Sequence, residues 1–170
     1  MPSRVARPEL SKADQDRLAQ SGIDLTMENR CGSYLQMDQD IVHAECAQEG
    51  IEVLSYKKAL EKYDWLKDYA WKVVSPEKDD ITKYVAAQKE PKGYVIIAHK
   101  GSSNILPIQA CLYLGSGQIQ HVHNIIIAEQ GSTLNIITGC ATAPGVRSGL
   151  HIGISEFFVK KGSTVSFTMI

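Results

Sequence analysis

The sequence lacks the features that would direct it into or across a membrane. Its apolar runs extend over only a few residues, whereas a membrane-spanning helix needs about 20. Residues 1–7 contain two arginines and no apolar core, so they do not resemble a secretory signal. No two cysteines form a Cys-x-x-Cys pair. We therefore expect a cytoplasmic protein with reduced thiols and no membrane partner. The cysteines are Cys31, Cys46, Cys111 and Cys140.

An excess of charge of either sign is also lacking. The chain has 18 basic and 19 acidic residues, a net charge of −1 and no basic block. Nucleic acid is therefore not an expected partner, because its phosphates are bound by concentrated positive charge. With 44% hydrophobic and 22% charged residues, the 170 residues fit one globular domain, or a domain with a small appendage, that can bury a core.

One short pattern occurs three times in the second half of the chain, at residues 96–103, 126–133 and 157–164. Each copy has an apolar triplet, two polar residues, a glycine and two small hydroxyl residues, and the glycines are 30 and 31 residues apart. This order predicts a strand, a tight turn and a second strand. A repeat of this length predicts a stacked solenoid. We therefore predict a mainly β fold in which residues 93–170 form coils of a parallel β-helix.

In a β-helix, residues one period apart lie on neighbouring coils, about 4.8 Å from each other. His121 and His151 are 30 residues apart, so we expect them on the same edge of consecutive coils. Cys111 and Cys140 are 29 residues apart and are expected on adjacent coils. The offset of one residue leaves open whether the two thiols share a face.

Residues 1–92 are predicted to form a separate module of helices and short strands. Ser11, with Asp14 three residues later, resembles a capping box, and Pro76 suits the first position of a helix. The apolar stripe of residues 56–73 is expected to cover the open end of the first coil; the alternative is a surface that binds a partner or cofactor. The expected elements are a frayed tail at 1–10, helices from 12 to about 22, at 56–73 and at 77–89, and strands at 34–37, 41–46 and 51–54.

The first group that could carry chemistry is the thiol of Cys140, within residues 139–144 (Gly-Cys-Ala-Thr-Ala-Pro). A sulfur acceptor or iron ligand must be a thiolate that a partner can reach. Gly139 before the thiol would leave room for that approach. The alternative is a small buried hydrophobe, the usual state of a cysteine in an apolar strand.

The second group is His121 and His123, which share one face of a predicted strand. With Gly115 they fit the start of a metal-binding cupin motif, Gly-x5-His-x-His. A cupin then needs a carboxylate four or five residues later, where residues 127 and 128 are apolar, and Glu129 comes late. A cupin-like metal-binding protein therefore stays an alternative. So does a purely structural solenoid with polar histidines on its outer face.

The third group, Arg147, His151 and Glu156, follows the turn at residues 144–145. These side chains could supply acid–base groups or iron ligands. The alternative is a solvated outer face of a coil.

Residues 123–154 resemble the SufB/SufD scaffold family of iron–sulfur cluster assembly. The likeness is strongest at 126–131 (Ile-Ile-Ala-Glu-Gln-Gly) and at 139–144, where that family has an apolar strand, Glu-x-Gly and then Glu-Gly-Cys-Thr-Ala-Pro. Residues 105–110 are similar to its Val-x-x-Pro-Leu-Gln-Ala stretch, and segments 50–55 and 69–76 to those before its β-helix. The resemblance covers about residues 50–170 and is closest to SufB, because the cysteine is present.

This resemblance implies a right-handed parallel β-helix that serves as a scaffold subunit of the SUF system. Its implied partners are a SufC-like ABC ATPase, a second SufB/SufD-like subunit or a homodimer, and a sulfur donor protein. The family's cysteine maps onto Cys140, as the site of persulfide acceptance and of transient cluster assembly. ATP hydrolysis belongs to the partner, so the chain is not expected to be an enzyme or to hold an organic cofactor tightly. Auxiliary metal ligands would be Cys111, His121, His123 and His151.

The chain departs from the family pattern at a few positions. Thr138 replaces the glutamate before Gly-Cys, Ala141 is additional, and residues 113–115 replace an Arg-Ile-Asn. The family's second half, with the helices that bind SufC and further ligand residues, has no counterpart in the sequence. Because residues 165–170 are predicted to form a strand, we expect another subunit or further coils to cover it.

Overall fold

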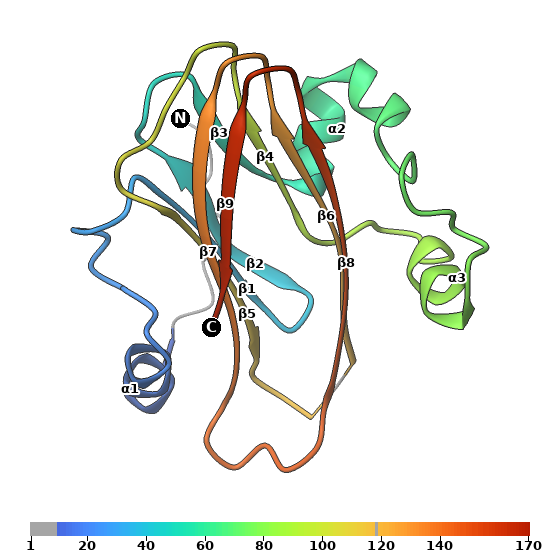
Figure 1. The fold of residues 1–170 in the computed structure, drawn as a ribbon. Helices are drawn as coiled ribbons and strands as arrows, with labels where there is room; N and C mark the ends of the chain where they lie inside the picture. Colours follow the sequence, from blue (N-terminus) through green and yellow to red (C-terminus); the bar gives the residue numbers. More distant parts are fainter. Residues whose placement is uncertain (1–9, 118) are drawn as a thin grey trace, which may run out of the picture.

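The structure is a computed structural model that describes residues 10–117 and 119–170; all but the last residue of the expected tail at 1–10 lies outside the described residues. The fold is mainly β, as predicted (Figure 1). No helix in the described part is long and apolar enough to cross a membrane. The strands are β1 (Gly32–Met37), β2 (Asp40–Cys46), β3 (Ile51–Ser55), β4 (Tyr94–Ala98), β5 (Ile108–Leu114), β6 (Ile119–Ala128), β7 (Thr133–Thr142), β8 (Leu150–Val159) and β9 (Thr164–Met169). The helices are α1 (Lys12–Gln20), α2 (Tyr56–Lys62), the 3₁₀ helix η1 (Asp64–Asp68) and α3 (Asp80–Ala86).

The strands form two sheets that face each other (Figure 1). Sheet A has the order β2-β1-β5-β7-β9, and sheet B has the order β3-β4-β6-β8. From β4 onward the chain alternates between the sheets, and the pairs β4–β6, β5–β7, β6–β8 and β7–β9 are parallel. The pairs β1–β2 and β3–β4 are antiparallel, so both sheets are mixed. Strands from both sides of residue 92 share the two sheets, and the predicted module boundary there stays a prediction.

The three repeated turns lie in a column at one end of the sheets (Figure 1). Gly101, Gly131 and Gly162 have φ of 72°, 71° and 70°, which glycine adopts without steric cost. The amide of Gly101 donates to the carbonyl of residue 130 at 3.1 Å, and that of Gly131 to residue 161 at 3.2 Å. The glycine spacing in the sequence thus predicted the stacking of these turns correctly.

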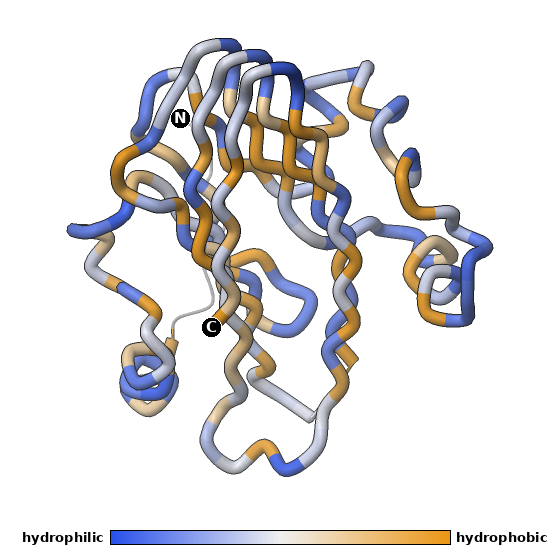
Figure 2. Tube along the Cα trace, viewed as in Figure 1, coloured by the Kyte–Doolittle hydropathy of each residue, from blue (hydrophilic) through white to orange (hydrophobic). Residues whose placement is uncertain are grey.

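The main core fills the space between the sheets, and two further apolar layers lie outside them. Figure 2 shows apolar positions across the central strands. Strands β4 and β6 are buried along almost their whole length, which explains their continuous apolar runs, because both faces are covered. Helix α1 packs on the outer face of sheet A through Leu18, and α2 with η1 on that of sheet B through Tyr56 and Leu66. The inner core contains Tyr34, Ile51, Val53, Tyr94, Ile96, Ala98, Ile108, Ala110, Leu112, Val122, Ile126, Leu134 and Ile136.

Helix α1 and strands β1 to β3 form where the sequence predicts them, and Ser11 caps α1. The helix expected over 56–73 is wrong, because Tyr63 has extended dihedrals and ends α2; its hydroxyl donates to Glu52 of β3 at 2.5 Å. The apolar stripe covers the outer face of sheet B instead of an open end. Helix α3 begins later than predicted, because Asp79 and Thr82 form a reciprocal capping box.

Replacing Ile126 with alanine should destabilise the fold strongly. Its side chain is completely buried in the inner core, so the change leaves a cavity and costs about 2–5 kcal/mol of unfolding free energy. Urea denaturation followed by circular dichroism measures the loss. Ile105→Ala is the matched control, because Ile105 is 94% exposed and should change stability by less than about 0.5 kcal/mol. Equal losses in the two variants would contradict the assigned core.

Candidate functional site

Cys140 is an exposed thiol on β7. Alternation along the strand places its side chain on the inner face of sheet A, the face of Ile136. A Cβ at Gly139 would lie 3.0 Å from the side chain of Ile170. A side chain at position 139 would therefore require Ile170 to shift, and the expected role of Gly139 in access to the sulfur stays a prediction.

Cys140 and His151 line the same pocket, of about 290 Å³, with Arg17 of α1. Nδ1 of His151 lies 3.0 Å from Oε1 of Gln120. The amide nitrogen of Gln120 donates to backbone carbonyls, at 2.8 Å to that of Asp38, so its oxygen must accept from His151. The proton of the neutral imidazole is therefore on Nδ1, and Nε2 keeps a lone pair that can accept a proton or bind a metal.

Partial desolvation in this pocket shifts the pKa of both groups. It raises the pKa of the Cys140 thiol and lowers the pKa of His151. At neutral pH the pocket is therefore lined by a protonated thiol and an uncharged imidazole. Arg17 adds positive charge at the rim, where its Nε donates to the carbonyl of Thr142 at 3.2 Å. A thiol of this kind is deprotonated when a metal or an electrophilic sulfur engages it.

His121 and His123 share one face of β6, as predicted, but that face is the outer one. Both line a second pocket of about 360 Å³ beneath the segment that connects η1 to α3. Nε2 of His123 lies 2.7 Å from Oε2 of Glu156, and its ring stacks on Trp71 with centroids 4.2 Å apart. Nδ1 of His121 accepts from Gln39 at 3.2 Å. Its other nitrogen, Nε2, is buried and has no hydrogen-bond partner among the described residues.

Glu156 anchors the segment that covers this second pocket. Its carboxylate accepts from the backbone amides of Trp71 at 2.7 Å, Val73 at 2.6 Å and Val74 at 3.1 Å, as well as from His123. The residue is 1% exposed, and a buried carboxylate is stable only when such donors replace its water. Trp71 has φ of 58°, which turns these amides toward the carboxylate. These hydrogen bonds therefore give Glu156 a structural role.

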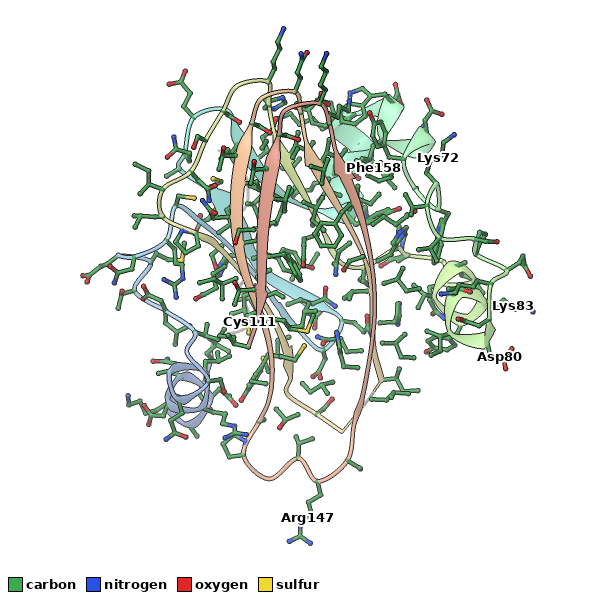
Figure 3. All side chains as sticks on the ribbon, in the orientation of Figure 1. Lys72, Asp80, Lys83, Cys111, Arg147 and Phe158 are labelled. Atoms are coloured by element: carbon green, nitrogen blue, oxygen red, sulfur yellow. The ribbon has the colours of Figure 1, made fainter. Side chains whose placement is uncertain are left out.

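The register of the paired strands separates histidines and cysteines that we expected to lie together. We expected His121 and His151 on the same edge, but His151 pairs with Gln120, so the two histidines point to opposite faces. Cys111 pairs with Gly139, so it too faces away from Cys140; burial raises its pKa to about 12. Arg147 projects away from the end of the molecule (Figure 3). Across residues 10–117 and 119–170, no three metal-ligating side chains cluster.

The proximity of Cys31 and Cys46 was not predicted from the sequence. Gly32 pairs with Cys46 across the β1–β2 hairpin, and the Cys46 sulfur lies 3.4 Å from the backbone oxygen of Cys31. The sequence did contain a signal for this proximity. Short strands were predicted at 34–37 and 41–46, and if they join as a hairpin their outer ends lie together. The pairing of His123 with Glu156 had no comparable signal.

Similar proteins are known for almost the whole chain, although no protein family model matches it. An iron-sulfur cluster assembly SufBD family protein of Archaeoglobus fulgidus is 51% identical over 157 residues, which are 92% of this chain and 42% of the relative. A protein of the same description from Methanothermobacter thermautotrophicus is 43% identical over 166 residues, 95% of this chain and 40% of the relative. One from Pyrococcus horikoshii is 25% identical over 146 residues, 82% of this chain and 32% of the relative.

These relatives are named as proteins of iron–sulfur cluster assembly. The chain belongs to their family, the SufBD family. It spans about two fifths of the length of the first two relatives. The resemblance found in residues 50–170 is thus confirmed, and the similarity extends over nearly the full sequence.

Acidification should destabilise the fold in the range where histidine titrates. Burial lowers the pKa of His121, His123 and His151 below 6.5. As pH falls from about 6.5, the histidines of the unfolded chain bind protons that those of the folded chain do not bind. The free energy of unfolding therefore decreases by up to about 1.4 kcal/mol per pH unit for each histidine. Urea unfolding at pH 7.5 and pH 5.5 measures this. His123→Gln keeps a donor for Glu156 and should reduce the slope; an unchanged slope would show that His123 does not contribute.

Glu156→Gln should release the segment of residues 71–74. The amide cannot accept all the hydrogen bonds of the carboxylate, and its NH₂ group opposes backbone donors, so we expect a loss of about 2–3 kcal/mol. The free energy of unfolding in urea tests this against Glu45→Gln, since Glu45 is exposed. A loss no larger than in this control would contradict the anchoring role.

Proposed function

We propose that this chain is part of a scaffold for iron–sulfur cluster assembly, in which Cys140 accepts sulfur or binds iron. Two findings support this. The relatives that cover most of the chain carry the name of that process. In addition, Cys140 is the exposed cysteine of the chain and opens into a pocket with His151. This shared pocket is the observation that carries the proposal.

The chemistry of the pocket suits a soft cargo. A thiolate and an imidazole are ligands that iron accepts, and the cluster is the substrate of the scaffold and not its resident cofactor. When a persulfide donor approaches, the Cys140 proton must leave, and Nε2 of His151 is an available acceptor in the same pocket. Arg17 favours the negative charge of the resulting thiolate or persulfide. The chain itself need not catalyse a reaction.

The scaffold, in this proposal, is a right-handed parallel β-helix whose coils are the successive pairs of strands in sheets A and B. The alternation of strands between two parallel ladders and the column of glycine turns support this architecture. We further propose that the complete assembly includes a SufC-like ABC ATPase, a second SufB/SufD-like subunit or a second copy, and a sulfur donor protein.

Anaerobic reconstitution with ferrous iron and inorganic sulfide tests the role of Cys140. Cys140→Ala should lower bound iron and cluster absorbance at least about tenfold, the loss usual for removing even a partner of a metal ligand. His151→Asn, which can keep the hydrogen bond to Gln120 but lacks Nε2, should also reduce the yield. Cys111→Ala is the matched control, because that thiol is buried on the opposite face of the sheet. Equal yields in Cys140→Ala and the control would remove Cys140 from the function.

A further inference from the structure

Two cysteines away from the Cys140 pocket form a thiol pair at the edge of sheet A. Cys31 immediately precedes β1, and Cys46 ends the edge strand β2. The Cys46 thiol donates to the Cys31 carbonyl oxygen at 3.4 Å, and the Cys31 sulfur accepts from Nδ2 of Asn104 at 3.6 Å. Both are free and partly exposed. They also border the same side of the inner core.

The surroundings of the pair assign different roles to the two sulfurs. The neighbouring Cys46 thiol lowers the pKa of Cys31 to about 7, helped by Nδ2 of Asn104 at 3.6 Å from the Cys31 sulfur. The same contact raises the pKa of Cys46. The thiolate is therefore favoured at Cys31, whose sulfur accepts from Asn104, while Cys46, whose thiol donates to the Cys31 carbonyl, keeps its proton. A thiolate beside a protonated thiol is the arrangement of a nucleophilic cysteine with a resolving partner.

Such a pair supplies what the proposed function requires and a single thiol cannot provide. Sulfur delivered as a persulfide is at the oxidation level of elemental sulfur, whereas a cluster contains sulfide. Each sulfur therefore needs two electrons, and oxidation of two thiols to a disulfide releases two. Cys140 has no such partner on the neighbouring strand β5, because Cys111 points to the opposite face of the sheet.

We propose that Cys31 and Cys46 form a dithiol that accepts sulfur from a persulfide and releases it as sulfide. This inference rests on the proposed function and adds a reductive step to it. The Cys31 thiolate attacks the outer sulfur of the donor, R–S–SH, which gives Cys31–S–SH and the donor thiolate R–S⁻. The Cys46 thiol then attacks the Cys31 sulfur, a Cys31–Cys46 disulfide forms, and the terminal sulfur leaves with the Cys46 proton as H₂S or HS⁻. An external dithiol reductant restores the pair.

Stoichiometric treatment with glutathione persulfide under anaerobic conditions tests the proposal. The parent protein, fully reduced and freed of reductant, should release about one sulfide per chain above a protein-free blank, and peptide mass spectrometry should find a Cys31–Cys46 disulfide. Cys46→Ser should retain the added sulfur on Cys31 and release no sulfide above the blank. Cys31→Ser should do neither.

Cys111→Ala is the matched control, because that thiol is buried on the outer face of sheet A, and its sulfide release should equal that of the parent. Equal release from Cys46→Ser and the parent, or a disulfide between other cysteines, would overturn the proposal. The Cys31–Cys46 disulfide is measured in the parent protein, so this part of the test does not depend on whether a variant folds.

Reconstitution with inorganic sulfide separates this inference from the proposed function. That sulfide is already reduced, so Cys31→Ser and Cys46→Ser should assemble as much cluster as the parent, while Cys140→Ala should not. If Cys140→Ala assembles normally and the sulfide release still depends on Cys31 and Cys46, the dithiol stands and the role of Cys140 falls. If cluster formation from inorganic sulfide also requires Cys31 and Cys46, they are ligands, and the reductive role is overturned.

Discussion

The hydrogen-bond ladders of the two sheets determine toward which face the histidines and the cysteines of the strands point. In a ladder, residues that pair across strands share a face, and neighbours along a strand have opposite faces. A shift of one residue therefore moves a side chain from the space between the sheets to the layer outside. His121 and His151 are separated in this way, although they lie on neighbouring strands. So are Cys111 and Cys140.

The two faces give these groups different environments. The inner face is closed by apolar packing near the glycine turns and opens toward the far ends of β7 and β8, where Cys140 and His151 meet a pocket. The outer face of sheet B is covered by α2, η1 and the segment held by Glu156. A fully buried carboxylate is expensive to desolvate, so its position is retained only while the backbone amides and His123 surround it. Glu156 thus attaches the segment between η1 and α3 to sheet B at one point.

Much of the fold followed from the sequence because its signals are local or periodic. The repeated glycines predicted the stacked turns, Ser11 predicted the start of α1, and the turn residues between the short strands predicted β1 to β3. The predictions failed where a distant contact overrode a local pattern. Tyr63, which bonds to Glu52, ends a helix that periodicity alone would continue. The Cys140 motif could be identified by its resemblance to a family, whereas its pocket depends on residues more than 100 positions away in the chain, such as Arg17.

The sequence by itself determined that the chain is built from β strands in repeated units, with a cysteine after a glycine near the end of one strand. It did so because strand alternation, turn chemistry and the repeat length are properties of neighbouring residues. Only the tertiary structure decided which thiols and imidazoles meet. The face of the sheet on which a side chain lies depends on the strand register. Register in turn depends on how strands far apart in the chain align, which no local pattern specifies to a single residue.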